Sequence, residues 1–171
     1  MRASSLHRLS FTAAVLTLCL PAAASAEQPD TKDAVPSQGT AWLNRQMSAL
    51  AERQGANGWH VTPSGLRWRR IAGPGSGARP GPTDHVTVHY VGTFVDGSEF
   101  DSSVRRGEPA TFPLNRVIKG WQEGVALMGV GDKVEFAIPY QIAYGADGKG
   151  PIPGGATLLF TVELLGIEPA T

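Results

Sequence analysis

The chain has 171 residues, a formal net charge of zero from 15 basic and 15 acidic residues, and a single cysteine. This balance leaves no excess of basic residues for a polyanion, so we expect no nucleic-acid partner. The length suffices for one domain with a hydrophobic core and a short extension, and one cysteine excludes an intramolecular disulfide.

The first 26 residues have the pattern of a secretory signal peptide. A basic start precedes an apolar run over residues 11–20, which is too short to span a bilayer, and residues 24–26 (ASA) form a small-residue cleavage site. We therefore predict a mature chain that begins at Glu27 and is periplasmic or secreted. No later apolar run approaches the roughly 20 residues of a membrane span, so we expect a soluble protein.

The next segment predicts a leader and one helix. Residues 27–39 are rich in proline, glutamine, aspartate and serine and predict a disordered leader. Leu43, Met47 and Leu50 recur at helical spacing after Thr40, an expected N-cap, which predicts a helix of about 14 residues. Two interpretations stay open, a helix docked on its own domain and a dimerisation arm. Because so short a helix offers a modest interface, we favour a monomer over a homodimer.

Alternating residues then predict a series of strands. Residues 61–71 alternate imperfectly and predict one strand, and the glycine- and proline-rich run 73–82 predicts a loop. The following strand carries one apolar face made of Val86, Val88, Tyr90, Gly92 and Phe94. Asp96-Gly97 is a hairpin signal, so residues 98–101 should return antiparallel, and residues 111–114 predict another short strand.

A single short helix and two further strands complete the predicted fold. Trp121, Val125 and Met128 are spaced i, i+4, i+7, which indicates one helix before two glycines. Residues 134–138 and 157–167 alternate again. The fold class is therefore α+β, an antiparallel sheet with one central helix. The predicted divisions are a signal peptide (1–26), a leader with a helical extension (27–60) and a domain (61–171).

The sequence offers little covalent chemistry. His85 and His89 lie four residues apart on a predicted strand, about 13 Å, so they cannot share an ion, and we predict no metal site. Residues 145–150 (GADGKG) lack the spacing of a phosphate loop, and no Gly-x-Ser-x-Gly elbow is present, so we predict no cofactor. Aromatic residues instead gather where elements end. An aromatic pocket with converging polar groups from Tyr90, Asp101 and Tyr144 is the resulting hypothesis.

Three long motifs resemble the FKBP-type peptidyl-prolyl cis-trans isomerases. They are VHYVGTFVDGSEFDSS (88–103), VIKGWQEGVALM (117–128) and AYGADGKGPIPGGATLLFTVELL (143–165). The run TPSGLRWRRI (62–71) is similar to the entry strand of periplasmic bacterial members with an N-terminal helical extension. The resemblance spans residues 62–167 and implies a curved antiparallel sheet wrapped around one short helix.

The resemblance also implies the roles of individual residues. Asp101, Tyr144 and Tyr90 take catalytic roles, with the Tyr144 hydroxyl and the Ile118 backbone N–H donating to a bound carbonyl. Trp121 becomes the floor on which a proline ring rests, and Arg106 steadies Asp101 and Tyr90. The remaining substrate-binding residues are the apolar wall formed by Phe100, Val117, Ile118, Ile152 and Phe160.

Some positions depart from the family pattern. Ala110 stands where many members carry an aromatic residue, so we expect a more open wall there, and Lys149 stands where others carry an aromatic or imidazole group. We expect Gly120 to leave room above the ring of Trp121. Substrate choice and the affinity for rapamycin-like macrolide inhibitors depend on such rim positions.

The implied activity is isomerisation of Xaa-Pro bonds in unfolded or partly folded exported polypeptides, which assists their folding. This reaction makes and breaks no covalent bond, which accounts for the missing nucleophile. Two alternatives remain: a chaperone or binding module that holds unfolded clients with little turnover, and a structural dimer that uses the helix over residues 40–54 as an arm.

Overall fold

The computed structural model describes residues 39–170, so the predicted signal peptide and leader lie outside the described residues. The helices are α1 (Thr40–Ala51), α2 (Ser103–Arg106) and α3 (Lys119–Ala126), with short 3-10 turns η1 (Ala56–Gly58), η2 (Leu114–Arg116) and η3 (Tyr140–Ile142). The strands are β1 (His60–Val61), β2 (Arg67–Ala72), β3 (His85–Thr93), β4 (Glu99–Ser102), β5 (Ala110–Pro113), β6 (Lys133–Ile138) and β7 (Leu158–Glu168). The α+β class is confirmed.

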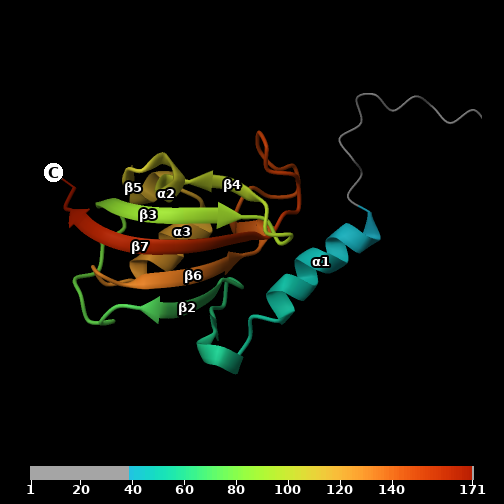
Figure 1. Ribbon diagram of the computed structural model, residues 1–171, viewed down its shortest axis with the longest axis horizontal. Helices are drawn as coiled ribbons and strands as arrows, with labels where there is room; N and C mark the ends of the chain where they lie inside the picture. The colour runs from blue at the N-terminus through green and yellow to red at the C-terminus, as the bar shows by residue number, and fades with distance from the viewer. Residues whose placement is uncertain (1–38, 171) are drawn as a thin grey trace, which may run out of the picture. The chain divides into compact units, whose positions relative to one another are not determined.

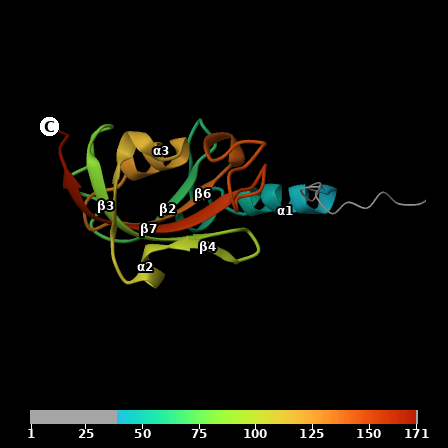
Figure 2. The same cartoon turned by 90° about the horizontal axis from the view of Figure 1, so that it is seen from above.

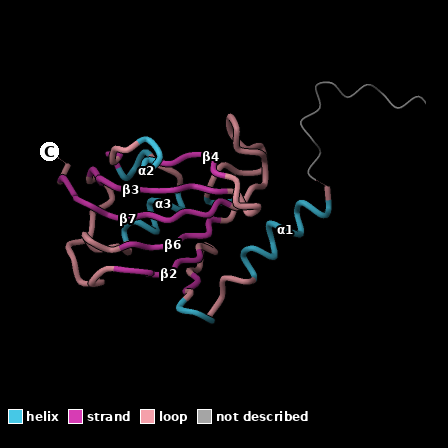
Figure 3. The backbone as a smooth tube through the Cα atoms, in the orientation of Figure 1, coloured by secondary structure: helices cyan, strands magenta, loops and turns pink. Residues whose placement is uncertain are grey.

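The strands form one antiparallel sheet in the order β1-β2-β6-β7-β3-β4 (Figures 1 and 3). β7 pairs with β3 along the whole of β3, with Tyr90 opposite Val162. The other edge of β3 is shared. β5 pairs with residues 85–88 at one end, and β4 pairs with residues 91–93 at the other. The predicted alternation of β3 is confirmed, because Val86, Val88 and Tyr90 are all buried.

The sheet curves around α3, which covers one face (Figure 2). Two glycines one turn apart let this helix approach β6 closely. A Cβ on Gly120 would lie 2.4 Å from Cγ2 of Ile138, and a Cβ on Gly124 would lie 2.6 Å from Cε1 of Phe136. The expectation that Gly120 leaves room above Trp121 is therefore wrong, because the space it leaves is filled by Ile138.

The helix α1 docks on the domain through a buried polar contact. The side-chain Oε1 of Gln46 accepts from the backbone N–H of Thr157 at 2.9 Å, at the point where β7 begins. Gln46 and Ala49 are buried, which supports the docked interpretation of this helix. The N-cap is Gly39 rather than Thr40, and the helix spans 12 residues. No helix among residues 39–170 is long and apolar enough to cross a membrane.

Two local predictions were wrong. Residues 61–71 are not one strand, because a turn separates β1 from β2. The N–H of Gly65 donates to the carbonyl of Thr62 at 2.9 Å, and Gly65 has a φ of 89°, which favours glycine. The sequence reading also missed α2, a single turn that Ser102 caps by accepting from the N–H of Arg105 at 3.1 Å. The predicted hairpin at Asp96-Gly97 is confirmed, with Phe94 N–H donating to the Ser98 carbonyl at 2.8 Å.

Candidate functional site

A cavity of about 400 Å³ opens between α3, β3 and the start of β7. Trp121 forms its floor from the first turn of α3 and is 4% exposed. The indole is held by three aromatic rings at nearly right angles: Tyr90 at 5.3 Å, Phe160 at 5.3 Å and Phe112 at 6.0 Å between centroids. Such edge-to-face contacts fix the orientation of the indole. The floor is therefore flat, apolar and rigid.

The aromatic wall depends on a glycine in β3. Phe100 meets Phe160 edge to face at 5.5 Å, and both rings lie against Gly92. A Cβ on Gly92 would lie 2.7 Å from Cζ of Phe100 and 2.8 Å from Cε1 of Phe160. Any side chain at this position would displace a ring. Gly92 follows Tyr90 on the same face of β3, so the aromatic wall and Tyr90 lie on one face of the strand.

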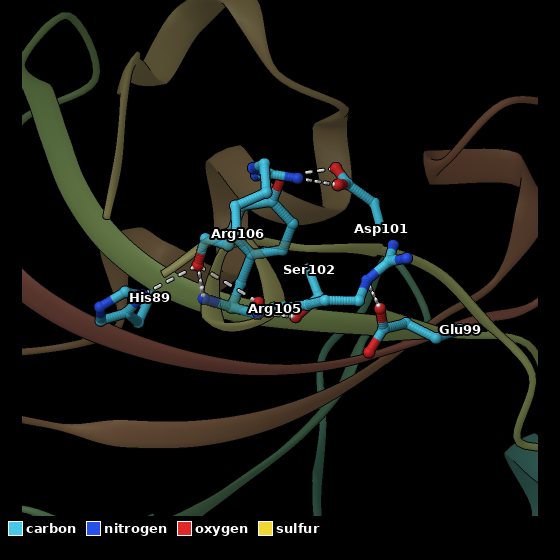
Figure 4. Close-up of polar contacts among 8 residues, drawn as sticks. His89, Glu99, Asp101, Ser102, Arg105 and Arg106 are labelled. Carbon is cyan, nitrogen blue, oxygen red and sulfur yellow. Dashed lines mark hydrogen bonds and ion pairs between the residues drawn. The ribbon is translucent and has the colours of Figure 1, made fainter. Parts of the chain in front are cut away.

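Tyr90, Asp101 and Arg106 form a closed hydrogen-bond network beside the cavity, and Figure 4 labels Asp101 and Arg106. The Tyr90 hydroxyl donates to Oδ2 of Asp101 at 2.5 Å. Arg106 donates through Nη1 to Oδ1 of Asp101 and through Nη2 to the Tyr90 hydroxyl at 2.9 Å. Tyr90 and Asp101 line the cavity, whereas Arg106 lies behind them. The resemblance implied this supporting position for Arg106, and α2 provides it.

The network sets the ionisation of its members. Burial, and then the hydrogen bond to Asp101, raise the pKa of the Tyr90 hydroxyl above its ordinary value. Burial opposes ionisation of Asp101, but the hydrogen bonds from Tyr90 and Arg106 outweigh it and hold the pKa of Asp101 below its ordinary value. The hydrogen bonds to Tyr90 and to Asp101 raise the pKa of Arg106. At neutral pH the cavity therefore contains a fixed carboxylate whose charge is balanced by a guanidinium.

A buried serine links this network to the sheet. Ser103 Oγ accepts from the backbone N–H of Tyr90 at 2.7 Å and donates back toward the Tyr90 carbonyl, which lies at 3.3 Å. The same oxygen lies 3.0 Å from Nδ1 of His89, which is labelled in Figure 4. Residues 89 and 90 are the part of β3 that neither β4 nor β5 pairs. The serine hydroxyl therefore takes the place of a strand partner there.

The lining of the cavity also contains two unused hydrogen-bond donors. Tyr144 lines the cavity just after η3 and is 36% exposed, and its hydroxyl has no hydrogen bond to residues 39–170. Ile118, the N-cap residue of α3, also lines the cavity. Its backbone N–H donates to no acceptor within the described part of the chain. Both donors are free to bind a ligand carbonyl.

Most of the predicted site residues meet in this cavity. Tyr90, Asp101 and Tyr144 line it together with Phe100, Val117, Ile118, Trp121 and Phe160. Ile152 does not line it, because its side chain is buried in the hydrophobic core. Ala110 does not line it either.

Two lining residues were missed from the predicted site. Phe112 reaches the cavity from β5, opposite Val86, and its aromatic side chain in the predicted strand over residues 111–114 was the available signal. Arg116 reaches it from η2, and no sequence pattern indicated that position. Among residues 39–170, no three His, Cys, Asp or Glu side chains are arranged to hold a metal ion.

Comparison with known proteins agrees with this geometry. The family model described as FKBP-type peptidyl-prolyl cis-trans isomerase matches residues 77–165. The chain is 52% identical over 137 residues to the "FKBP-type peptidyl-prolyl cis-trans isomerase FkpA" of Aeromonas hydrophila, covering 80% of this chain and 49% of that protein. It is 48% identical to the "FKBP-type 22 kDa peptidyl-prolyl cis-trans isomerase" of Escherichia coli K12, covering 78% of this chain and 62% of that protein.

A solved structure gives the same fold. The crystal structure of FkpA from Escherichia coli superposes with a TM-score of 0.69 at 39% sequence identity, covering 75% of this chain and 59% of that one. The chain thus spans about half to three fifths of the length of these relatives.

Proposed function

The chain belongs to the family of FKBP-type peptidyl-prolyl cis-trans isomerases, and on that premise we propose that it accelerates the rotation of Xaa-Pro bonds in the cavity above Trp121. One observation carries the proposal: a flat, buried indole and two free hydrogen-bond donors, the Tyr144 hydroxyl and the Ile118 N–H, line the same cavity of about 400 Å³. A proline ring fits the indole, and the donors suit the carbonyl groups beside it.

The chemistry needs no nucleophile. The barrier to rotation is the loss of amide resonance, about 18–20 kcal/mol. In the twisted transition state the nitrogen is pyramidal and the carbonyl carries less negative charge, so an apolar cavity stabilises it relative to the planar ground state. Because only interactions stronger in the transition state accelerate the reaction, the aromatic walls provide the main effect. A lowering of about 6 kcal/mol corresponds to roughly a 10⁴-fold acceleration.

Asp101 has an electrostatic role in this proposal. Its carboxylate lines the cavity and stays ionised because Tyr90 and Arg106 donate to it. A negative charge held there interacts more favourably with the carbonyl carbon of the twisted bond than with that of the planar, delocalised amide. We predict that Asp101→Leu slows isomerisation, and an unchanged rate in this variant would end the electrostatic role.

The direct test is isomerisation of Ala-Leu-Pro-Phe peptides, followed by NMR exchange between cis and trans signals. We expect Tyr144→Phe to lose about two- to tenfold in kcat/KM, the effect of one hydrogen bond. Tyr140→Phe is a matched control, because Tyr140 is equally exposed at 36% but does not line the cavity. The proposal fails if the wild-type chain accelerates none of the peptides.

We further propose that the substrates are unfolded or partly folded exported polypeptides, which rests on the signal-like residues 1–26. Fractionation of expressing cells and N-terminal sequencing test this location, with Glu27 as the expected first residue. Rapamycin-like macrolides are proposed inhibitors of the same cavity, and competition with the peptide assay tests them. Light scattering tests the proposed monomer.

A holding function is the second candidate, favoured by exposed apolar residues on α1. Leu43 is 45% and Met47 68% exposed, and they border a groove of about 520 Å³ that also contacts Tyr140. An assay of how well each variant suppresses the aggregation of an unfolded client protein, run beside the peptide assay, would separate the two activities. We expect Leu43→Ser with Met47→Ser to weaken suppression, and Tyr144→Phe to weaken isomerisation alone.

A further inference from the structure

Two cationic side chains from distant parts of the sequence line the cavity. Arg116 is the last residue of η2 and directly precedes the wall residue Val117. Lys149 lies in the loop after Tyr144. Both residues are exposed, and both line the same cavity as Trp121. Neither has a role in the mechanism described above.

Neither cation is neutralised by the protein. Several other basic residues of the domain pair with carboxylates, as Arg69 does with Glu135 and Lys133 with Glu163. Over residues 39–170, Arg116 and Lys149 have no ion pair and no side-chain hydrogen bond. The rim therefore keeps both positive charges available.

The carboxylates around the cavity do not neutralise these two positive charges. Among residues 39–170, Asp101 is the only acidic residue that lines it, one carboxylate against two cations, and it also forms an ion pair with Arg106. Asp147 is close to Lys149 in sequence but forms no ion pair with a described residue. On α3, Glu123 accepts a hydrogen bond from Ser64 at 2.6 Å. A ligand in the cavity thus meets an excess of positive charge.

The backbone on both sides of the cavity is well anchored. Lys149 and Ile152 exchange two backbone hydrogen bonds of 2.9 and 3.0 Å, and Ile152 is buried. On the other side, Leu114 of η2 is fully buried, and the Gln122 side chain donates to the Val117 carbonyl at 2.7 Å. The long side chains of Arg116 and Lys149 therefore extend from fixed points.

We propose that Arg116 and Lys149 select Xaa-Pro segments that carry an aspartate or glutamate within two residues of the proline. The inference rests on the proposed function and names its substrate class. An extended chain advances about 3.3–3.6 Å per residue, so a carboxylate this close to a proline seated on Trp121 stays within reach of the rim. Exposed charge pairs of this kind each contribute modestly and weaken with salt.

The test compares peptides that differ only in one charge. Ala-Xaa-Pro-Phe with Xaa as glutamate, glutamine or lysine places the charge before the proline, and Ala-Leu-Pro-Phe-Xaa with Xaa as glutamate or glutamine places it after. The kcat/KM of each is measured at about 10 mM and 500 mM salt for the wild-type chain, for the double variant Arg116→Gln with Lys149→Gln, and for Lys119→Gln. Lys119 is the matched control, because it is exposed and close to Arg116 in sequence but does not line the cavity.

For the wild-type chain at low salt we expect a preference of about two- to fivefold per cation for glutamate over glutamine in at least one series, expressed mainly in KM. High salt and the double variant should remove this preference, whereas Lys119→Gln should keep it. The double variant should lower the kcat/KM of the glutamate peptides more than that of the glutamine peptides.

Equal turnover of glutamate and glutamine peptides by the wild-type chain overturns the inference while leaving the proposed function intact. So does a preference that survives in the double variant. If no peptide is accelerated, the proposed function fails instead. In that case, dissociation constants of the same peptides test the charge preference without turnover. They are measured by titration, with the indole N–H resonance of Trp121 as the NMR signal.

Discussion

Gly92 and Phe100 are in contact so close that a single methyl group would not fit between them. The Cα of Gly92 faces the end of the Phe100 ring, and a Cβ would lie 2.7 Å from its Cζ atom. We predict that Gly92→Ala destabilises the domain by about 1–3 kcal/mol, because overpacking forces rings off their rotamers. It should also slow peptide isomerisation, since the displaced rings form the cavity wall.

Urea denaturation and the peptide assay measure the two effects. The matched control is Gly166→Ala in β7, where an added Cβ would meet nothing within 4 Å. This control should leave activity unchanged and stability equal or slightly higher, because alanine loses less backbone entropy than glycine. If Gly92→Ala and Gly166→Ala had the same stability and the same activity, the close packing around Gly92 would not explain the effect.

The sequence predicted the strands better than the contacts between them. Alternation identified β3, because one face of it is buried without interruption. The turn at Gly65 was visible in Pro63-Ser64-Gly65 but was outweighed by the apolar residues on each side. Gly120 shows the limit, because its neighbour Ile138 is 18 residues away and local pattern carries no information on that contact.

The site was predicted in the same uneven way. Aromatic residues and the three motifs indicated the floor and much of the wall, since these residues belong to regular elements. Arg106 came only from the family resemblance, because the single turn of α2 that brings it to Asp101 is too short for a periodic signal. Arg116 was missed because its position depends on η2, an irregular turn.

Ser103 should be a positioning residue. Ser103→Ala removes the hydroxyl that accepts from the Tyr90 N–H and leaves this buried donor without a partner, a loss of about 1–3 kcal/mol in the free energy of unfolding. Ser48→Ala on the exposed side of α1 is the control and should be neutral. Activity measured well below the unfolding transition should fall for Ser103→Ala, because Tyr90 loses its support. Full activity in a destabilised variant would confine Ser103 to folding.

Asp132 should give the domain part of its sensitivity to acid. Burial opposes ionisation of this carboxylate, but the N–H groups of Gly129 and Gly75, at 2.9 and 2.7 Å, and the nearby Arg70 hold its pKa below its ordinary value. A lowered pKa adds stability at pH values above the unfolded value of about 3.9. That contribution is lost as the pH falls from about 4 through the folded-state pKa.

Asp132→Asn should therefore be less stable than the wild-type chain at pH 7, by about 1.5–3 kcal/mol, and the difference should shrink below pH 4. The pKa of Asp101 is also held below its ordinary value, so the Asp132 contribution is read from the difference between the two proteins. Denaturation curves from pH 2 to 7 measure it. Asp147→Asn, on an exposed loop, provides the same chemical change as a control. A pH-independent difference would refute the assignment.

Gln46 should hold α1 on the domain. Gln46→Ala leaves the buried N–H of Thr157 without an acceptor, so we expect a loss of about 1–3 kcal/mol and faster proteolysis within α1. Asn44→Ala, on the exposed side of the same helix, should change neither. If Gln46→Ala unfolds with wild-type stability, the helix does not contribute to the folded domain.

The stretch of chain from β4 to β5, the two strands that share one edge of β3, has a consequence for how the site can evolve. It leaves β3 through β4 and returns through β5, and it contributes Asp101, Arg106 and Phe112. Between the two strands Gly107 is exposed, and an added Cβ there would meet nothing within 4 Å. Insertions at this point would reshape one wall of the cavity while β7 continues to hold β3. The fold thus separates a part that can diversify from a part that must be kept, and substrate choice can change without a new scaffold.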